Sequence, residues 1–90
     1  MGVKVKIHWA HRNYTGGLDV VEVEGKTVGD CIDDLVRKFP EIKKGLYDKS
    51  GQFISYIQVY INMKKADPDV RGKAVKEGDV IDLKFILAGG

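Results

Sequence analysis

The sequence predicts an α+β roll, in which one main helix packs on one face of a mixed β-sheet. Three observations predict it: apolar and polar residues alternate in a segment near each end of the chain, one amphipathic helix lies between them, and further strand-like segments follow that helix. A helix with one apolar stripe must bury that stripe, and an alternating sheet offers one apolar face to cover it. We therefore expect the opposite face of the sheet to be solvated or to bind partners.

The first two strands are expected to form a hairpin with a long loop. Strict alternation over Val3–Trp9 predicts a strand whose core face consists of Val3, Val5, Ile7 and Trp9. A polar loop containing Gly16-Gly17 follows, and β-branched residues in Leu18–Glu24 predict the second strand. Its alternation slips at Val20-Val21, which suggests a β-bulge.

The main helix is predicted to follow Thr27, because Thr27 and Asp30 have the spacing of a capping box. Pro40 is expected to help end it. Apolar residues in this segment recur at intervals of three and four, which gives the helix one apolar face: Val28, Cys31, Ile32, Leu35, Val36 and Phe39.

The second half of the chain is predicted to supply the remaining strands. A polar connection from residue 40 to residue 53 contains a helical turn near residues 43–47, and turns are expected at 67–69 and 76–79. The strand Ile54–Asn62 places three apolar residues on one face, Ile57, Val59 and Ile61, and three polar or aromatic ones on the other, Tyr56, Gln58 and Tyr60. The last strand, Val80–Leu87, carries Ile81, Leu83, Phe85 and Leu87 on one face.

Length and composition indicate one globular domain over residues 1–90 and argue against several classes of protein. Hydrophobic residues make up 43% and charged residues 31%, a balance typical of soluble domains. The 15 basic and 13 acidic residues are spread along the chain, so no basic block predicts nucleic-acid binding. No leader or membrane-spanning pattern is recognised, and we expect a cytoplasmic protein with no membrane partner. A single cysteine excludes an internal disulfide and a four-cysteine iron–sulfur cluster.

Four features of the sequence, taken in their order and spacing, point to a family. They are the order of the elements, the helix start Thr27-Val28-Gly29-Asp30, the strand end Val59-Tyr60-Ile61-Asn62, and Glu77-Gly78-Asp79-Val80 leading to a terminal Ala88-Gly89-Gly90. Together they resemble the MoaD/ThiS family of ubiquitin-like sulfur-carrier proteins over nearly the whole chain. The ending resembles ThiS, which serves thiazole (thiamine) synthesis, whereas the length is nearer MoaD, which serves molybdopterin synthesis. The resemblance therefore leaves the pathway open.

This resemblance implies a β-grasp fold and a protein cosubstrate rather than an enzyme. In such a cycle a ubiquitin-activating-type enzyme uses ATP to adenylate the terminal glycine. A sulfur donor then converts the acyl-adenylate to a thiocarboxylate, which delivers sulfur to an acceptor biosynthetic enzyme. No cofactor is expected to stay bound to the chain, since ATP is used by the activating partner.

The C-terminal tail is the expected reacting group. The Gly90 carboxylate is an anion at neutral pH, because the reference pKa of a C-terminal carboxyl is about 3.3 to 3.7, and it can attack the α-phosphate of ATP. Gly89 and Ala88 are small enough for a narrow channel. These three residues reach only about 10 Å when extended, so the end of the last strand must dock close to the partner's active site. The expected partner interface comprises Lys84, Ile86, Leu87, Tyr56 and Tyr60.

Other candidate residues are expected to be structural. Cys31 lies on the apolar helical stripe and is expected to be buried and inert. His8 and His11 lack a third metal ligand and are expected at the surface, so no metal site is predicted. Gly16-Gly17 lacks the surroundings of a phosphate-binding loop.

Two other functions remain open on the sequence. The chain is also compatible with a ubiquitin-like modifier joined to target lysines through Gly90, or with a non-catalytic β-grasp binding module whose tail is inert. No nucleophile–base pair or metal constellation suggests catalysis by the chain itself.

Overall fold

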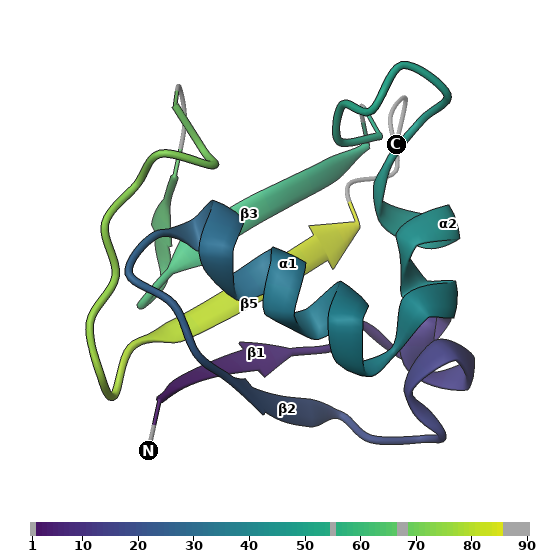
Figure 1. The fold of residues 1–90 in the computed structure, drawn as a ribbon, viewed down its shortest axis with the longest axis horizontal. Coiled ribbons are helices and arrows are strands. Elements are labelled where there is room, and N and C mark those ends of the chain that lie inside the picture. Colours follow the sequence, from purple (N-terminus) through teal and green to yellow (C-terminus); the bar gives the residue numbers. More distant parts are fainter. Residues whose placement is uncertain (1, 55, 67–68, 86–90) are drawn as a thin grey trace.

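The β-sheet of this computed structural model places the last strand of the chain between two neighbours (Figure 1). The structure describes residues 2–54, 56–66 and 69–85. Strand β1 pairs antiparallel with β2 and parallel with β5, and β3 pairs antiparallel with both β5 and β4. The five strands lie in the order β2-β1-β5-β3-β4, with bounds β1 Val3–Lys6, β2 Val20–Val23, β3 Ile57–Ile61, β4 Lys64–Lys65 and β5 Val80–Phe85. The sheet is mixed, as predicted.

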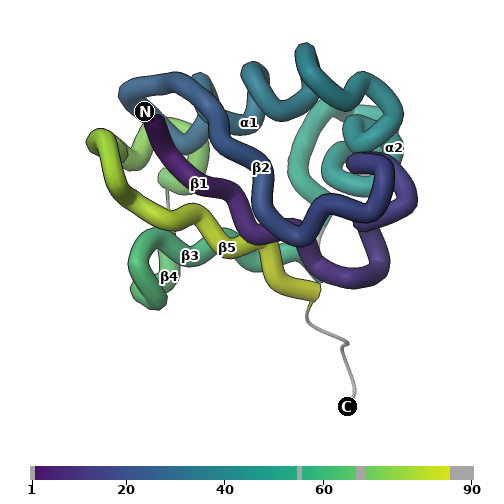
Figure 2. The backbone as a smooth tube through the Cα atoms, turned by 90° about the horizontal axis from the view of Figure 1, so that it is seen from below, coloured from purple at the N-terminus to yellow at the C-terminus, as the bar shows by residue number. Residues whose placement is uncertain are grey.

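Helix α1 (Val28–Lys38) covers one face of this sheet, and Figure 2 shows the helix and the strands as separate layers. Thr27 is its N-cap, and the Thr27 hydroxyl accepts a hydrogen bond from the N–H of Asp30 at 3.1 Å. The core between the layers contains Ile32 and Leu35 from α1 and Val5, Ile81 and Leu83 from the sheet. The opposite face of the sheet carries lysines. The predicted α+β roll is confirmed.

Three short helical segments close one end of the sheet (Figure 1). They are η1 (Trp9–Thr15), η2 (Pro40–Ile42) and α2 (Lys43–Leu46). They pack tightly, because a Cβ atom added at Gly45 would lie 2.7 Å from Cδ2 of His11. The helical turn predicted near residues 43–47 is therefore confirmed as α2, and it rests on η1.

The first strand is shorter than predicted, and the prediction that Trp9 lies in the core is wrong. Strand β1 ends at Lys6, and His8 becomes the N-cap of η1, where its Nδ1 accepts from the N–H of Ala10 at 3.1 Å. The backbone has left the sheet before Trp9, so the alternation no longer decides which way the indole points. Trp9 is 73% exposed.

The bulge expected in the second strand is absent. Strands β1 and β2 pair in continuous register from Val3↔Val23 to Lys6↔Val20. Val20 is exposed and Val21 is buried. The slip in the sequence pattern arises because a valine occupies a solvent-facing position, and the backbone is regular there.

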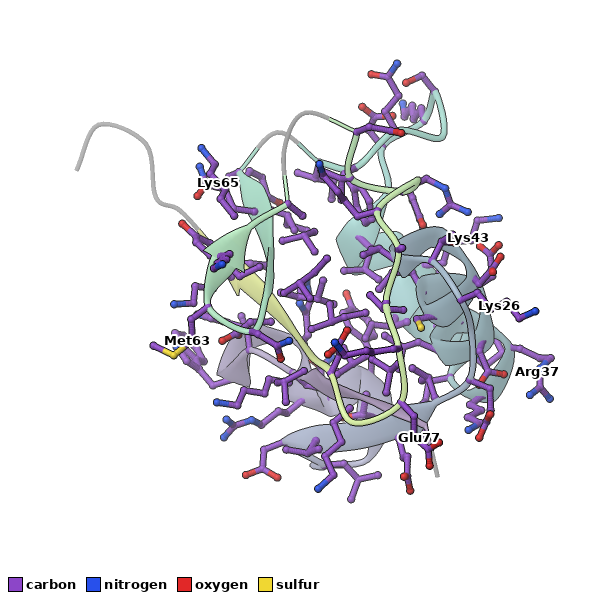
Figure 3. All side chains as sticks on the ribbon, turned by 90° about the vertical axis from the view of Figure 1, so that its left-hand side faces the viewer. Lys26, Arg37, Lys43, Met63, Lys65 and Glu77 are labelled. Atoms are coloured by element: carbon purple, nitrogen blue, oxygen red, sulfur yellow. The ribbon has the colours of Figure 1, made fainter. Side chains whose placement is uncertain are left out.

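The later strands follow the prediction within the described residues. Ile57 and Val59 are buried and Ile61 is partly buried against the core, on the face predicted for them. Strand β5 buries Ile81 and Leu83, whereas Leu87 lies outside the described residues. Lysines and arginines project from the exterior of the fold, including the labelled Lys26, Arg37 and Lys43 on the helical side (Figure 3). No helix in the described part of the chain is long and apolar enough to span a membrane.

Candidate functional site

The predicted reacting residues, Ala88, Gly89 and Gly90, lie outside the described residues, as do the predicted interface residues Ile86 and Leu87. The structure describes the site up to Phe85, the last residue of β5 and the point from which the tail continues. We call this point the tail root.

Backbone pairing holds β5 on both edges as far as Asp82, and β3 alone pairs with it at the tail root. Residues Lys4 to Lys6 of β1 pair with Val80 to Asp82, and β3 pairs with β5 as far as Ile57↔Phe85. A strand in the middle of a sheet uses its N–H and C=O groups on both edges, so it frays less readily than an edge strand.

Three rings surround the side chain of Phe85. The His8 ring stacks on it, with centroids 4.8 Å apart and planes at 12°. The ring of His11 meets it edge-on at 4.4 Å, and that of Tyr56 meets it edge-on at 5.3 Å. Stacked and edge-to-face pairs in this distance range are favourable contacts between aromatic rings. We call these four residues the aromatic clamp.

His11 is buried, with 2% of its surface exposed, so the prediction that it lies at the surface is wrong. Its Nε2 is 2.9 Å from the carbonyl oxygen of Gly45. A carbonyl only accepts, so Nε2 carries a proton and Nδ1 does not when the ring is neutral. The Nδ1 atom is buried and has no hydrogen-bond partner among the described residues. Burial lowers the pKa of His11 below its ordinary value of 6.5, the bond to Gly45 opposes that effect, and His8 adds to it.

The other predicted interface residues are divided between two places. Lys84 and Tyr60 come together on the sheet face opposite α1, where the Lys84 ammonium lies 4.9 Å from the centre of the Tyr60 ring. The Tyr60 hydroxyl donates to Oε1 of Gln58 at 3.0 Å. Tyr56 lies one residue before β3, belongs to the aromatic clamp, and is 43% exposed.

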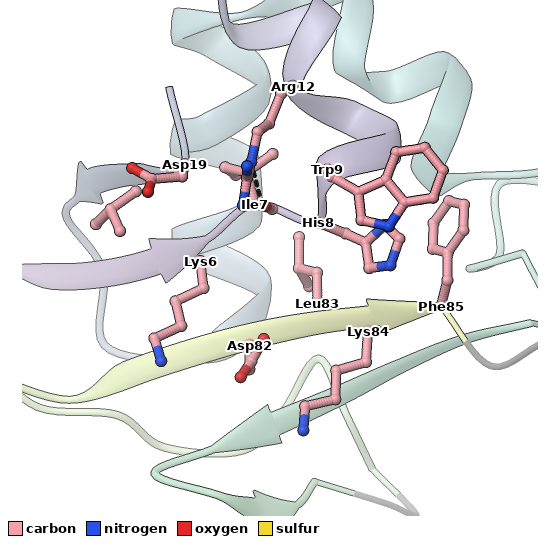
Figure 4. Close-up of a pocket in the computed structure, with 11 residues that line it drawn as sticks. Lys6, Ile7, His8, Trp9, Arg12, Asp19, Asp82, Leu83, Lys84 and Phe85 are labelled. Carbon is pink, nitrogen blue, oxygen red and sulfur yellow. Dashed lines mark hydrogen bonds between the residues drawn. The ribbon is translucent and has the colours of Figure 1, made fainter. Parts of the chain in front are cut away.

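A pocket of about 540 Å³ adjoins the tail root (Figure 4). Trp9, His8 and Phe85 gather along one side of it, and Lys6, Asp82 and Lys84 lie along the strands below. The cations that line the pocket are Lys6, Arg12 and Lys84, and none of them forms an ion pair with a carboxylate among the described residues. Of the residues that line this pocket, only Lys84 was predicted from the sequence to belong to a partner interface. The pocket is lined by Lys6, Ile7, His8, Trp9, Arg12, Asp19, Val20, Asp82, Leu83, Lys84 and Phe85.

The remaining candidates carry no chemistry in the described residues. Cys31 is fully buried, as predicted, and burial together with nearby carboxylates raises the pKa of its thiol to about 11. A thiol in that state is a poor nucleophile at neutral pH. No group of three or more His, Cys, Asp or Glu side chains in the described ranges is placed to hold a metal ion. Gly16 and Gly17 have positive φ angles and form the turn that ends η1.

Comparisons with known proteins give a consistent result. The model of the ThiS family matches residues 6–90. A chain of the BexX/CysO complex from Amycolatopsis orientalis is similar over 99% of this chain and 100% of its own length, with a TM-score of 0.88 and 32% identity. CysO from Mycobacterium tuberculosis is similar over 96% and 100%, with a TM-score of 0.88 and 27% identity. Small archaeal modifier protein 1 from Haloferax volcanii is similar over 98% of both chains, with a TM-score of 0.83 and 26% identity. A comparison with curated protein sequences gave no match.

Proposed function

This chain belongs to the ThiS family, and from that premise we propose that it is a sulfur-carrier protein whose reacting group is the C-terminal carboxylate of Gly90. The observation that carries the proposal is a family match that runs to residue 90 and therefore includes the terminal Gly89-Gly90. The chain acts as a protein cosubstrate, binds no cofactor of its own, and depends on a partner that uses ATP.

The proposed chemistry proceeds in two balanced steps. An oxygen of the Gly90 carboxylate attacks the α-phosphorus of ATP, the bond to the β-phosphate oxygen breaks, and pyrophosphate leaves. The product is a mixed anhydride of Gly90 and AMP. Hydrosulfide supplied by a sulfur donor then attacks the Gly90 carbonyl carbon, the bond from that carbon to the phosphate oxygen breaks, and AMP leaves. Loss of the S–H proton gives the thiocarboxylate. An acceptor biosynthetic enzyme takes up the sulfur, for molybdopterin, thiazole or a related product.

The surface beside the tail root is the proposed docking site for the activating enzyme. Lys84 and Tyr60 present a cation and an aromatic ring on the open sheet face, and Lys6 and Arg12 line the adjoining pocket. Trp9 adds a largely exposed indole at the same end, and exposed aromatic residues are common anchors of protein interfaces. The similar chain from Amycolatopsis orientalis comes from a complex, which supports a partner-binding role for this fold.

The direct test is the intact mass of the protein isolated from its own cells under conditions that preserve thiocarboxylates. We expect a fraction of the protein to show the mass gain of one oxygen replaced by sulfur. The same protein without Gly90 is the control and should show no such species. Finding only unmodified protein while a sulfur-transfer pathway is active would count against the proposal.

A second candidate function is a ubiquitin-like modifier. The similarity to small archaeal modifier protein 1 favours it, because that protein is described as a modifier. Both functions share the acyl-adenylate, and they differ in the group that attacks it. If the chain is a modifier, cleavage of total cell protein after Lys and Arg followed by mass spectrometry would show the six residues that follow Lys84 attached through Gly90 to lysines of other proteins.

A further inference from the structure

We infer that Phe85 is a positioning residue for the adenylation of Gly90: its clamped ring fixes the tail root, and the fixed root sets where the tail can deliver its carboxylate. This inference rests on the proposed function. The structure supports it through the ring contacts of Phe85, the anchoring of those rings, and the short length of chain that follows.

The rings that hold Phe85 are themselves anchored to different segments. His8 is fixed as the N-cap of η1 by its bond with Ala10. His11 connects η1 to α2 through Gly45, and Gly45 leaves no room for a Cβ beside the His11 ring. Tyr56 lies one residue before β3, whose first residue, Ile57, pairs with Phe85. The tail root is therefore held by three rings, which are anchored at η1, α2 and β3, and by its backbone pairing with β3.

A fixed root matters because the tail is short. Five residues follow Phe85 in the sequence. When extended they reach at most about 17 to 18 Å, so the position of the root largely decides where the Gly90 carboxylate can arrive. Loss of the ring frees the backbone at position 85 to fray. A frayed residue must be ordered again inside the docked complex before the tail can react. The entropy cost of ordering one residue lowers the fraction of docked complexes that can react by roughly tenfold.

The effect should fall on kcat rather than on KM. The chain is a substrate of its activating enzyme, and its folded surface determines how tightly it docks. A frayed root leaves Lys84, Tyr60 and the pocket largely in place, but slows insertion of the tail once the chain has docked. Partial unfolding has the opposite signature, because it lowers the concentration of competent substrate and so raises the apparent KM with kcat unchanged.

The experiment measures pyrophosphate release from ATP by the ubiquitin-activating-type enzyme of the same cells, at increasing concentrations of the chain. Three variants are compared with the wild type: Phe85→Ala, Phe85→Tyr, which keeps the ring, and Phe39→Ala. Phe39 is a half-buried phenylalanine that packs on the core at the end of α1 and serves as the matched control. We expect Phe85→Ala to lower kcat about tenfold with KM within about twofold, and Phe85→Tyr to restore most of kcat.

The outcomes separate this inference from the proposed function. A raised KM with unchanged kcat for Phe85→Ala, matching Phe39→Ala, would show that Phe85 only stabilises the fold and would overturn the inference alone. An equal loss of kcat in Phe85→Ala and Phe85→Tyr would also overturn it, because the ring contacts would not be the cause. If the wild type supports no Gly90-dependent pyrophosphate release, the proposed function and the inference both fail.

Discussion

The fold favours the neutral form of the His11 ring over its protonated form. In the neutral ring, Nε2–H donates to the Gly45 carbonyl and Nδ1 carries no proton. Protonation would place a charged N–H group at Nδ1, where the described residues offer no acceptor. A buried donor without an acceptor carries a desolvation cost, and this is why burial lowers the pKa of this ring.

The first prediction concerns the pH dependence of stability. The folded-state pKa of His11 is lowered, so between that pKa and about 6.5 the unfolded state binds more protons. The contribution of neutral His11 to the free energy of unfolding is therefore fully present above pH 6.5. It is lost as the pH falls toward the folded-state pKa. We expect the urea midpoint of the wild type to decrease when the pH is lowered from 7.5 to 5.5. The variant His11→Gln should be less stable than the wild type at pH 7.5, but its urea midpoint should decrease less at pH 5.5. An equal decrease of the midpoint in both proteins would contradict this prediction.

Asp34 and Asp79 titrate in a separate window and should not confuse that measurement. Hydrogen bonds from the N–H of Glu24 to Asp34, and from the side-chain amide of Asn62 to Asp79, lower the pKa of each carboxyl below 3.8. Their stabilising effect is present above the ordinary carboxyl pKa and is lost only in more acidic solution.

Cys31 is the subject of the second prediction. The thiol is fully buried and its pKa is raised from 9.0 to about 11, so its thiolate fraction at pH 8 is about a hundredfold below that of a free thiol. We expect iodoacetamide to leave the native protein unmodified at pH 8 and to label it fully in urea, as read by intact mass. Rapid labelling of the native protein would show that α1 opens readily.

At the scale of elements, the sequence predicts best where the signal is local. Helix α1 was predictable because its N-cap hydroxyl, its apolar spacing and Pro40 all lie within one short segment. The end of β1 was not, because the alternation continues through Ile7, His8 and Trp9 while the backbone turns into η1. What turns the chain there is the packing of His11 against α2, and that contact joins residues 34 positions apart.

The turn between β3 and β4 gives the third prediction. Asn62 and Met63 form a two-residue hairpin loop, with φ angles of 50° and 72°. Such turns favour Asn followed by Gly, and Met63 is 89% exposed, so its side chain contributes little packing. We expect Met63→Gly to raise the free energy of unfolding by about 0.5 to 1 kcal/mol.

The matched control for that turn is Met63→Ala. This variant removes the exposed side chain but keeps the Cβ that disfavours a positive φ. Its free energy of unfolding should stay near that of the wild type in a urea titration. A stabilisation equal to that of Met63→Gly would mean that the methionine side chain, rather than the backbone angle, is responsible.

At the scale of the whole molecule, the sequence predicts the sheet but not the contacts around the end of its last strand. The order of strands and helix in the sequence predicts a mixed sheet, which the structure confirms, and the Gly-Gly after the last strand stays a prediction of the reacting end. The aromatic clamp joins His8, His11 and Tyr56 to Phe85, residues that only the folded sheet brings together. No local pattern distinguishes such rings from surface residues, although two histidines three positions apart, beyond a strand, are a signal worth testing in similar sequences.

The last prediction follows from the central place of β5 and the length of the tail. If the activating enzyme docks beside Lys84 and Tyr60 while the tail root stays fixed, the tail must span a fixed distance to the nucleotide. Deleting Ala88 shortens its reach by about 3.5 Å, more than the roughly 1 Å displacement that can cost about a hundredfold in rate. We expect the deletion of Ala88 to lower the rate of pyrophosphate release by at least about a hundredfold and to leave the circular dichroism spectrum unchanged.

Inserting a second alanine beside Ala88 should be milder than deleting one. The longer tail still reaches the nucleotide, and ordering the extra residue costs about tenfold or less. This asymmetry between shortening and lengthening is what a clamped root requires, because a root free to fray would lend extra residues to a shortened tail. Equal losses for the two variants, or wild-type activity in the deletion, would show that the tail root does not stay fixed during activation.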